Sequence, residues 1–247
     1  MSKLQKNILF VLIGLSVALL VSKILAPYPF RYLMLLFEVI LTGVAIGNTV
    51  MTRDKRTSLI LAAFVCMTTG DAVINFTPYV KLQIVSFALC HILLSIYFCL
   101  EAPIRRSDLK RAIIILVISA VVYVLEMVPV WPSEYGLIFA GYIVLLSFML
   151  WRAVSYRNRE FNPRKTAILV AGAVCFYLTD VLVGVRILYG SDIVNIPIYI
   201  VYPPALLCMG IFNWYHSSIK CWKKNKQINN LNAEIQNSTS EQSLEIS

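Results

Sequence analysis

The chain has 247 residues, of which 59% are hydrophobic and only 14% are charged. A soluble fold of this length could not bury so much apolar surface, so the composition excludes a soluble enzyme, a disordered chain and a secreted disulfide scaffold. The formal net charge is +9, but the basic residues lie at the ends of apolar stretches, where they indicate membrane topology, and we expect no nucleic-acid partner.

Eight apolar stretches follow one another along the chain, with short polar segments between them. Each has about the 20 residues that a helix needs to cross a bilayer. The pattern therefore predicts an all-α, polytopic membrane protein with eight transmembrane helices. The predicted spans cover about residues 7–25, 30–51, 57–75, 79–100, 112–130, 136–154, 166–187 and 193–216.

The basic residues gather at one set of alternate ends of these spans. The exceptions among the 22 lysines and arginines are Lys23, Arg31, Lys81 and Arg186, which fall toward the other set of ends. Basic loops stay in the cytoplasm, so this distribution predicts that the N and C termini are both cytoplasmic. Only an even number of spans satisfies that prediction.

Past Trp222 the sequence becomes polar and has no aromatic residues. Such a segment cannot bury enough apolar surface to fold, and we expect residues 218–247 to form a disordered polar cytoplasmic tail. Residues 1–217 then make up one eight-helix transmembrane domain. We expect a multi-pass integral membrane protein, located in the cell membrane if the host is bacterial.

Small residues and prolines inside the spans predict local packing. Gly43 and Gly47 form a GxxxG motif, and small residues also occupy 171–173; both patterns favour close helix packing. Pro203 and Pro204 lie inside the eighth span, where the missing N–H groups are expected to bend or break the helix. Freed carbonyls are tolerated in a membrane only beside protein or water, so this span is expected to border a polar cavity.

Two carboxyl groups lie deep within predicted spans. Asp71 and Asp180 each come about 14 residues after the start of a span, which places both roughly 21 Å from the cytoplasmic end. A charged carboxylate near the bilayer centre costs at least ~2.5 kcal/mol. We therefore interpret these two aspartates as candidate catalytic residues.

Other polar groups are expected close to this layer, because they lie at similar depth or share a helix face with an aspartate. The candidate substrate-binding residues are Glu38, His91, Tyr142, Tyr177, Tyr202 and Arg186. Two of them have an alternative interpretation. Glu38 fits a pair with Arg31, seven residues earlier on the same stripe, and His91 fits a hydrogen-bonded core residue.

The sequence offers no clustered set of metal ligands. Of the six cysteines, five lie inside apolar runs and none forms a CxxC pair, so they are interpreted as reduced packing residues. His91 is far in sequence from the other histidine, His216. We expect no metal and no cofactor.

Several segments resemble the YhhN family of integral membrane proteins, which includes lysoplasmalogenases. Gly70-Asp71, His91, Tyr142 and Asp180 fall where the motifs of that family fall. The segments that carry the resemblance are TGDAVINFTPYVKLQIVSFALCHILLSIYF, YGLIFAGYIVLLSFMLWRAV, GAVCFYLTDVLVGVRIL and YPPALL.

The resemblance implies hydrolysis of the vinyl ether bond of lysoplasmalogens to a fatty aldehyde and glycerophospho-ethanolamine or glycerophosphocholine. The expected partners are a lysophospholipid substrate and membrane lipid. Vinyl ethers resist bases but yield to acid, and two buried carboxyls supply a protonated acid and an ionised base. No GxSxG, HExxH or Ser-His-Asp pattern offers another mechanism.

A lysolipid bound at this layer would need contacts for its phosphate and its chain. Arg186 lies two turns beyond Asp180 and is a candidate contact for the phosphate, although it fits snorkelling to the interface equally well. The expected tail contacts are Phe87, Leu94, Phe139 and Leu146.

Two other functions fit the same residues. Paired intramembrane carboxylates, a histidine and a broken helix also suit a proton-coupled transporter. A lipid-binding membrane protein without activity is the third alternative. Aldehyde release from lysoplasmalogen, as opposed to proton-dependent uptake into liposomes, distinguishes the enzyme from the transporter.

Overall fold

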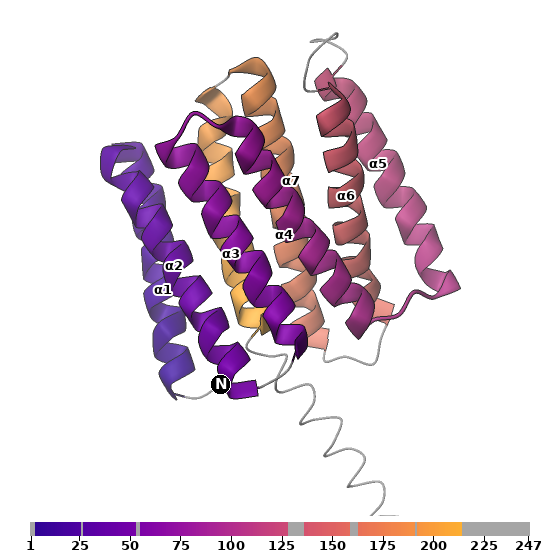
Figure 1. Cartoon of the computed structure of the whole chain (residues 1–247), viewed down its shortest axis with the longest axis horizontal. Coiled ribbons are helices and arrows are strands. Elements are labelled where there is room, and N and C mark those ends of the chain that lie inside the picture. Colours follow the sequence, from indigo (N-terminus) through magenta and orange to yellow (C-terminus); the bar gives the residue numbers. More distant parts are fainter. Residues whose placement is uncertain are drawn as a thin grey trace, which may run out of the picture.

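The computed structural model describes residues 3–25, 27–52, 55–127, 136–158, 163–190 and 192–213. Within these residues the chain forms eight long helices joined by short connections (Figure 1). They are α1 (Lys3–Leu25), α2 (Pro27–Thr52), α3 (Lys55–Phe76), α4 (Val80–Glu101), α5 (Leu109–Met127), α6 (Gly136–Val154), α7 (Pro163–Tyr189) and a C-terminal helix (Asn195–Asn213). Short 3-10 turns are η1 (Arg106–Asp108), η3 (Ser155–Asn158) and η4 (Asp192–Val194).

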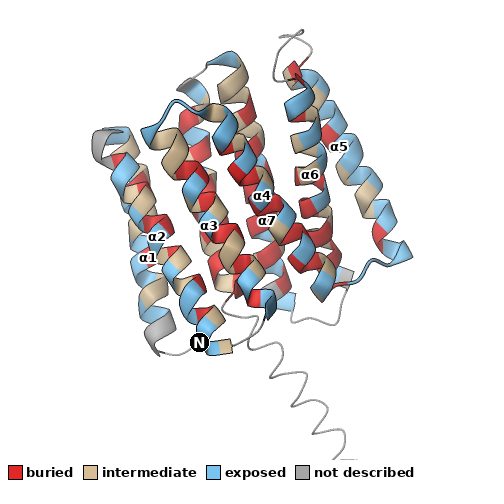
Figure 2. Ribbon diagram, in the orientation of Figure 1, coloured by how far each residue is buried: buried red, intermediate tan, exposed pale blue. Residues whose placement is uncertain are grey.

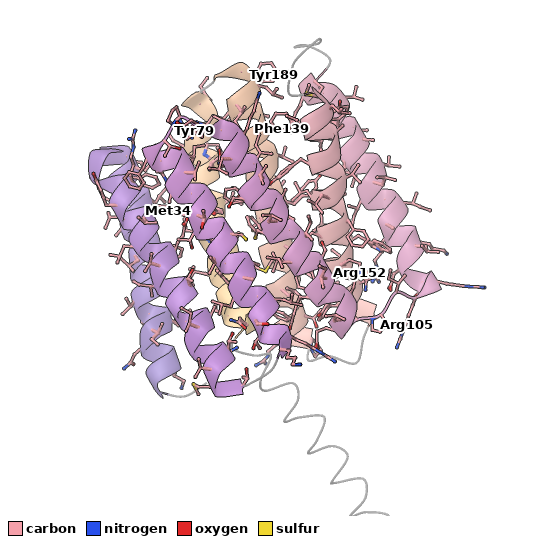
Figure 3. All side chains as sticks on the ribbon, in the orientation of Figure 1. Met34, Tyr79, Arg105, Phe139, Arg152 and Tyr189 are labelled. Carbon is pink, nitrogen blue, oxygen red and sulfur yellow. The ribbon has the colours of Figure 1, made fainter. Side chains whose placement is uncertain are left out.

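Successive helices run in opposite directions through the bundle (Figure 1). The side-chain view places Tyr79 and Tyr189 at one end and Arg105 and Arg152 toward the other, and we call these the Tyr79 end and the Arg105 end (Figure 3). The eight helices confirm the predicted all-α architecture. The predicted tail, residues 218–247, lies outside the described residues.

Seven of the described helices are long and apolar enough to cross a membrane, and α5 is the exception. It has 19 residues and carries Lys110 and Arg111 in its first turn and Glu126 near its last residue. An 18-residue stretch of α5 therefore always includes three charged groups. The sequence pattern predicted this span three residues later, at about 112–130, which omits the two basic residues.

The helices pack as a bundle with α1 and α5 at its two edges (Figure 1). Among the described residues of α5 only Ser119 and Met127 are buried, and the rest of the helix is exposed or half-buried (Figure 2). Its exposed side chains are mostly valine, leucine and isoleucine. An apolar outer face around a packed interior suits a lipid environment.

Polar contacts between helices fix the register of α2. Thr42 Oγ1 on α2 lies 3.0 Å from Thr68 Oγ1 on α3. Nearer the Arg105 end, Asn48 Nδ2 donates to the backbone oxygen of Asn213 at 3.0 Å and to its side-chain oxygen at 2.9 Å. These bonds hold α2 against both α3 and the C-terminal helix, which carry residues of the candidate site.

A fully buried arginine ties the connections together at the Arg105 end. The Arg152 guanidinium donates to the backbone oxygen of Ala102 and lies 3.9 Å from Asp108 Oδ2. Asp108 also makes contacts that hold the local structure: its Oδ2 accepts from the Arg105 N–H at 3.0 Å, and its backbone oxygen accepts from Trp151 Nε1 at 2.9 Å. Arg152 is therefore a buried anchor rather than a cytoplasmic surface charge.

The small-residue predictions have different outcomes. Gly172 packs closely, since a Cβ there would lie 2.7 Å from Cys208 Cβ on the C-terminal helix. Gly43 and Gly47 are exposed and have no atom within 4 Å of an added Cβ. No described helix packs closely against this GxxxG motif, so that prediction is wrong for the described part of the chain. The opposite face of α2, which carries Ala45, points inward instead.

The double proline does not interrupt the C-terminal helix, which is continuous from Asn195 to Asn213. The predicted break is therefore wrong. Pro203 and Pro204 have no N–H to donate to the carbonyls one turn earlier, those of Tyr199 and Ile200. That part of the helix borders the cavity described below, as predicted.

Candidate functional site

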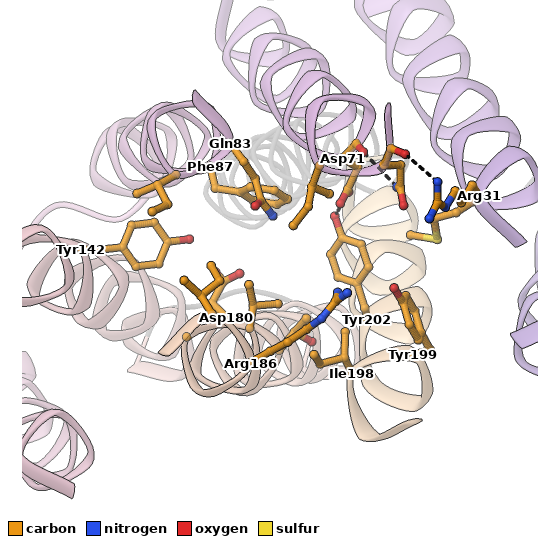
Figure 4. A pocket seen from close by; sticks show the side chains of 18 of the residues that line it. Arg31, Asp71, Gln83, Phe87, Tyr142, Asp180, Arg186, Ile198, Tyr199 and Tyr202 are labelled. Carbon is orange, nitrogen blue, oxygen red and sulfur yellow. Dashed lines mark hydrogen bonds between the residues drawn. The ribbon is translucent and has the colours of Figure 1, made fainter. Parts of the chain in front are cut away.

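A cavity of about 200 Å³ lies in the half of the bundle nearer the Tyr79 end, as its lining residues show. Figure 4 shows its lining side chains from close by. Every long helix except α5 contributes to its wall, and we call it the central cavity. Its polar lining residues are Lys23, Arg31, Asp71, Asn75, Gln83, Tyr142, Thr179, Asp180, Arg186, Tyr199 and Tyr202. The remaining wall is aromatic and aliphatic, and includes Phe30, Met34, Phe87, Phe139 and Ile198.

Both predicted catalytic aspartates line this cavity (Figure 4). Asp71 comes from α3 and Asp180 from α7, and each is 9% exposed. The two helices run in the same direction, so the similar depth inferred from the sequence brings their carboxyls to one chamber. The geometry gives each carboxyl its own set of hydrogen-bond partners.

Asp180 is held by a histidine from α4. His91 Nε2 lies 2.7 Å from Asp180 Oδ2 and 3.1 Å from the Tyr142 hydroxyl. The imidazole is fully buried and packs against the ring of Phe176, with centroids 5.0 Å apart. This hydrogen bond joins Nε2 to the Asp180 carboxyl, so His91 contacts the site from behind Asp180 and is not part of the cavity wall.

Asp71 is held by a tyrosine from the C-terminal helix. The Tyr202 hydroxyl donates to Asp71 Oδ2. One turn further along α3, Asn75 Nδ2 donates to the backbone oxygen of Asp71 at 2.9 Å, and Arg31 donates to the backbone oxygen of Asn75 at 3.3 Å (Figure 4). The sequence identified Tyr202 but not this connection to α2.

Glu38 lies behind Asp71 and does not line the cavity. The Thr42–Thr68 contact sets the register of the antiparallel helices α2 and α3, and Glu38 and Asp71 each lie about one turn beyond it on the same side. Glu38 is fully buried and interacts electrostatically with Asp71. Its carboxyl oxygens have no hydrogen bond of good geometry among the described residues. The suggested pair with Arg31 is not formed, because Arg31 reaches Asn75 instead.

Tyr177 occupies a different interface. Its hydroxyl lies 2.7 Å from Ser119 Oγ on α5, and Ser147 Oγ on α6 donates to the same serine at 2.6 Å. This network joins α5, α6 and α7 outside the central cavity. Tyr177 is therefore not included in the candidate site, whereas Tyr142, Tyr202 and Arg186 line the cavity.

The predicted tail contacts divide in the same way. Phe87 and Phe139 form part of the cavity wall. Leu94 and Leu146 are buried in the packed core instead. The apolar part of the cavity wall therefore lies nearer the Tyr79 end than the sequence indicated.

Several polar lining residues were not selected as site residues from the sequence. Gln83 is buried, and its Oε1 has no hydrogen-bond partner among the described residues. It precedes His91 by eight residues, so the helical stripe through His91 could have identified it. Lys23 and Arg31 were interpreted only as topological signals, because a basic residue at a span end usually serves that purpose.

Among the described residues, no group of three or more His, Cys, Asp or Glu side chains could hold a metal ion. His91 meets Asp180, while Asp71 meets Tyr202 and Glu38, and these are separate contacts. The central cavity thus contains two carboxyl groups, each with its own hydrogen-bond partner. Such an arrangement is suited to moving two protons.

Comparison with known proteins supports the resemblance found in the sequence. The profile of the YhhN family matches residues 30–210, which include both aspartates, His91 and the wall of the cavity except Lys23. No curated protein and no solved structure matches the chain. The YhhN family includes lysoplasmalogenases. Because the match covers most of the sequence, the chain belongs to the YhhN family of integral membrane proteins.

Proposed function

We propose that this protein is a membrane-embedded hydrolase that cleaves the vinyl ether bond of lysoplasmalogens. The products would be a fatty aldehyde and glycerophospho-ethanolamine or glycerophosphocholine. The observation that carries the proposal is the convergence of Asp71 and Asp180 on one partly apolar cavity. Membership of a family that includes lysoplasmalogenases supports the same reaction.

Asp71 is the proton donor in this mechanism. Glu38 is buried beside it, and two neighbouring carboxyls away from water share a proton in preference to carrying two charges. The Asp71 proton goes to the vinyl carbon that does not bear oxygen. The other vinyl carbon and the ether oxygen then share the positive charge of an oxocarbenium ion.

Asp180 is the ionised partner. The hydrogen bond from His91 stabilises its carboxylate, which lies where it can stabilise the oxocarbenium ion. Water adds to the carbon that bears oxygen, and Asp180 takes the proton released. A hemiacetal results.

The second half of the reaction restores both carboxyls. The hemiacetal hydroxyl gives its proton to Asp71, and Asp180 gives its proton to the departing glycerol oxygen. The carbon–oxygen bond to glycerol breaks and the aldehyde forms. Each aspartate thus returns to its starting state without any further reactant than water.

The test is aldehyde release by the purified protein from a lysoplasmalogen. Asp71→Asn and Asp180→Asn should each lower turnover by at least about 100-fold, because an amide at the same position can neither give nor take the proton. Glu101→Gln is the matched control, since Glu101 pairs with Arg56 at the Arg105 end, far from the cavity. A saturated alkyl lysolipid should release no aldehyde, since it lacks the double bond.

Two results would reject the proposal. Near-normal turnover in either aspartate variant would contradict the mechanism with two carboxyls. A folded wild-type protein that releases no aldehyde but drives proton-dependent uptake into liposomes would be a transporter.

We also infer that the Arg105 end faces the cytoplasm and that both termini lie there. Described basic residues of this end include Arg56, Arg105, Arg106, Lys110 and Arg157. Lys23, Arg31, Lys81 and Arg186 lie toward the Tyr79 end. The excess of basic residues marks the cytoplasmic side, so the central cavity lies in the outer half of the membrane.

A further inference from the structure

We propose that a small pocket behind Asp180 holds the water molecule that adds to the oxocarbenium ion, and that Glu126 positions this water. The inference rests on the proposed hydrolase function and adds a carboxyl group that the mechanism above does not use. It assigns a site to the attacking water and a part in that site to the edge helix α5.

A second, smaller cavity lies between α5, α6 and α7, and we call it the side pocket. Its volume is about 10 Å³, which is enough for one water molecule. Tyr123 and Glu126 line it from α5, none of whose described residues lines the central cavity. Four residues line both cavities, so the two adjoin along a shared wall. The shared residues are Phe139, Tyr142, Asp180 and Gly184.

The Glu126 carboxyl is turned toward α7. Its Oε2 lies 3.3 Å from the position that a Cβ on Gly184 would occupy. Its Oε1 is buried and has no hydrogen-bond partner among the described residues. A buried carboxyl oxygen without a partner is costly, and a bound water is the ligand that most often satisfies such an atom.

The spacing between Glu126 and Asp180 suits one bridging water. Gly184, beside which the Glu126 carboxyl lies, follows Asp180 by four residues, or about 6 Å along α7. Two hydrogen bonds of about 2.8 Å that meet at a water oxygen span nearly the same length. His91 contacts Asp180 at Oδ2. A carboxylate accepts up to about four hydrogen bonds, so Asp180 retains capacity for the water.

Hydrogen bonds to neighbouring helices fix α5 at the side pocket. The Tyr189 hydroxyl on α7 donates to the backbone oxygen of Glu126 at 2.8 Å. The Tyr123 hydroxyl donates to the backbone oxygen of Gly136 on α6 at 3.1 Å. These contacts hold the backbone that carries Glu126 and leave its carboxyl for another ligand.

A water at this position has the orientation that the reaction needs. One of its hydrogens points to Asp180 and the other to Glu126, so an oxygen lone pair is left for the carbon that bears the ether oxygen. As this carbon–oxygen bond forms, the O–H bond toward Asp180 breaks and the proton goes to Asp180. The hydrogen toward Glu126 stays on the hemiacetal hydroxyl. Because Gly184 has no side chain, it leaves space in the shared wall for this approach.

Aldehyde release by the full-length protein in detergent micelles tests the role of Glu126. Glu126→Leu should lower kcat about tenfold, because an oxocarbenium ion without a positioned water returns its proton to Asp71. Glu126→Gln should keep most of the rate, since its amide oxygen accepts the same hydrogen bond, and KM should stay within about twofold of the wild type in both variants. A wild-type kcat in Glu126→Leu, or equal losses in the two variants, would overturn the proposal.

The size of the side pocket can be changed in both directions. Gly184→Ala places a Cβ 3.3 Å from Glu126 Oε2 and 3.5 Å from the Phe139 ring, so it narrows the pocket and should lower kcat. Gly141→Ala on α6 is the matched control, because its Cβ meets open space and turnover should be that of the wild type. Equal turnover by Gly184→Ala and Gly141→Ala would contradict a water site at the shared wall.

Glu126→Ala enlarges the pocket and should admit a larger nucleophile. In buffer that contains methanol, this variant should form the methyl acetal of the lipid, because methanol adds in place of water and gives its proton to Asp180. The wild type should release the aldehyde alone. This product ratio does not depend on how much of the variant folds, and an acetal yield no higher than that of the wild type would argue against the assignment.

A structure of the full-length protein that resolves ordered waters distinguishes failure of the site from failure of the hydrolase. It should show a water within hydrogen-bond distance of both Glu126 and Asp180, and Gly184→Ala should lack it. A side pocket without this water would overturn the proposal even if the wild type releases aldehyde. The water in a protein that releases no aldehyde would retain the site and reject the hydrolase.

Discussion

The buried histidine beside Asp180 is a positioning group. His91 has no exposed surface, and its Nε2 is directed at the carboxylate and at the Tyr142 hydroxyl. The sequence left two interpretations of this residue, a hydrogen-bonded core histidine and a site residue. The structure combines them, because a core position gives the imidazole a fixed orientation and the partner is a candidate catalytic carboxyl.

Replacing this histidine should therefore impair turnover more than substrate binding. We expect His91→Phe, which keeps the packing against Phe176 but removes the donor, to lower kcat about 10- to 100-fold with little change in KM. His91→Gln should restore part of the rate, because its amide can donate to Asp180. Ser95→Ala is the control one turn along α4, since the buried Ser95 hydroxyl has no partner among the described residues. A shared loss of kcat in both positions would indicate general disruption of α4.

Glu38 shows where residue-level inference from sequence reached its limit. The sequence placed it at the depth of the aspartates but left its partner open, because depth along a helix does not give rotation about the helix axis. The Thr42–Thr68 contact settles the rotation and turns Glu38 toward Asp71. The polar lining residues from other helices, such as Gln83, depend on such rotations in the same way.

Removal of the Glu38 carboxyl tests its connection to Asp71, the proposed proton donor. We expect Glu38→Gln to lower kcat by about tenfold or more while KM stays close to that of the wild type, because Glu38 lies behind Asp71 and does not touch the cavity. Glu38→Asp should retain more activity than Glu38→Gln. Steady-state aldehyde release provides both constants, and an equal rise in KM for the two variants would instead place Glu38 in contact with substrate.

At the scale of elements, it was far easier to predict which segments form helices than to predict which residues lie at the contacts between helices. Apolar length alone identified eight segments, because a membrane requires every backbone polar group to be paired within a helix. Which small residues lie at interfaces depends on neighbours distant in sequence. Gly172 meets the C-terminal helix and Gly70 meets Phe87 of α4, whereas the GxxxG of α2 faces outward.

Two glycine substitutions measure this difference. Gly172→Ala introduces a Cβ only 2.7 Å from Cys208 Cβ and 3.4 Å from the backbone oxygen of Ala205, so the C-terminal helix must move. We expect a loss of about 1–3 kcal/mol in stability. Gly43→Ala meets open space and should leave the thermal midpoint in detergent unchanged. If Gly43→Ala were as destabilising as Gly172→Ala, the outer face of α2 would have to pack against another molecule.

At the scale of the whole molecule, charge is sorted along the bundle axis. The Arg105 end holds most described basic residues and a fully buried arginine, Arg152, that binds the helix connections. The opposite half holds the cavity, whose lining includes the two aspartates together with Lys23, Arg31 and Arg186. In the proposed orientation, a lipid of the outer leaflet would reach this cavity without crossing the membrane.

Topology mapping tests this orientation directly. Successive helices alternate in direction, so Arg157 and the end of the C-terminal helix lie at one end of the bundle, and Gly190 lies at the other (Figure 1). Green fluorescent protein fused after Arg157 or at the C terminus should fluoresce, since it folds in the cytoplasm. Alkaline phosphatase fused after Gly190 should be active in a bacterial host, because it requires export. Active phosphatase at the C terminus would show that the protein has the opposite orientation. The cavity would then bind lipid from the cytoplasmic leaflet.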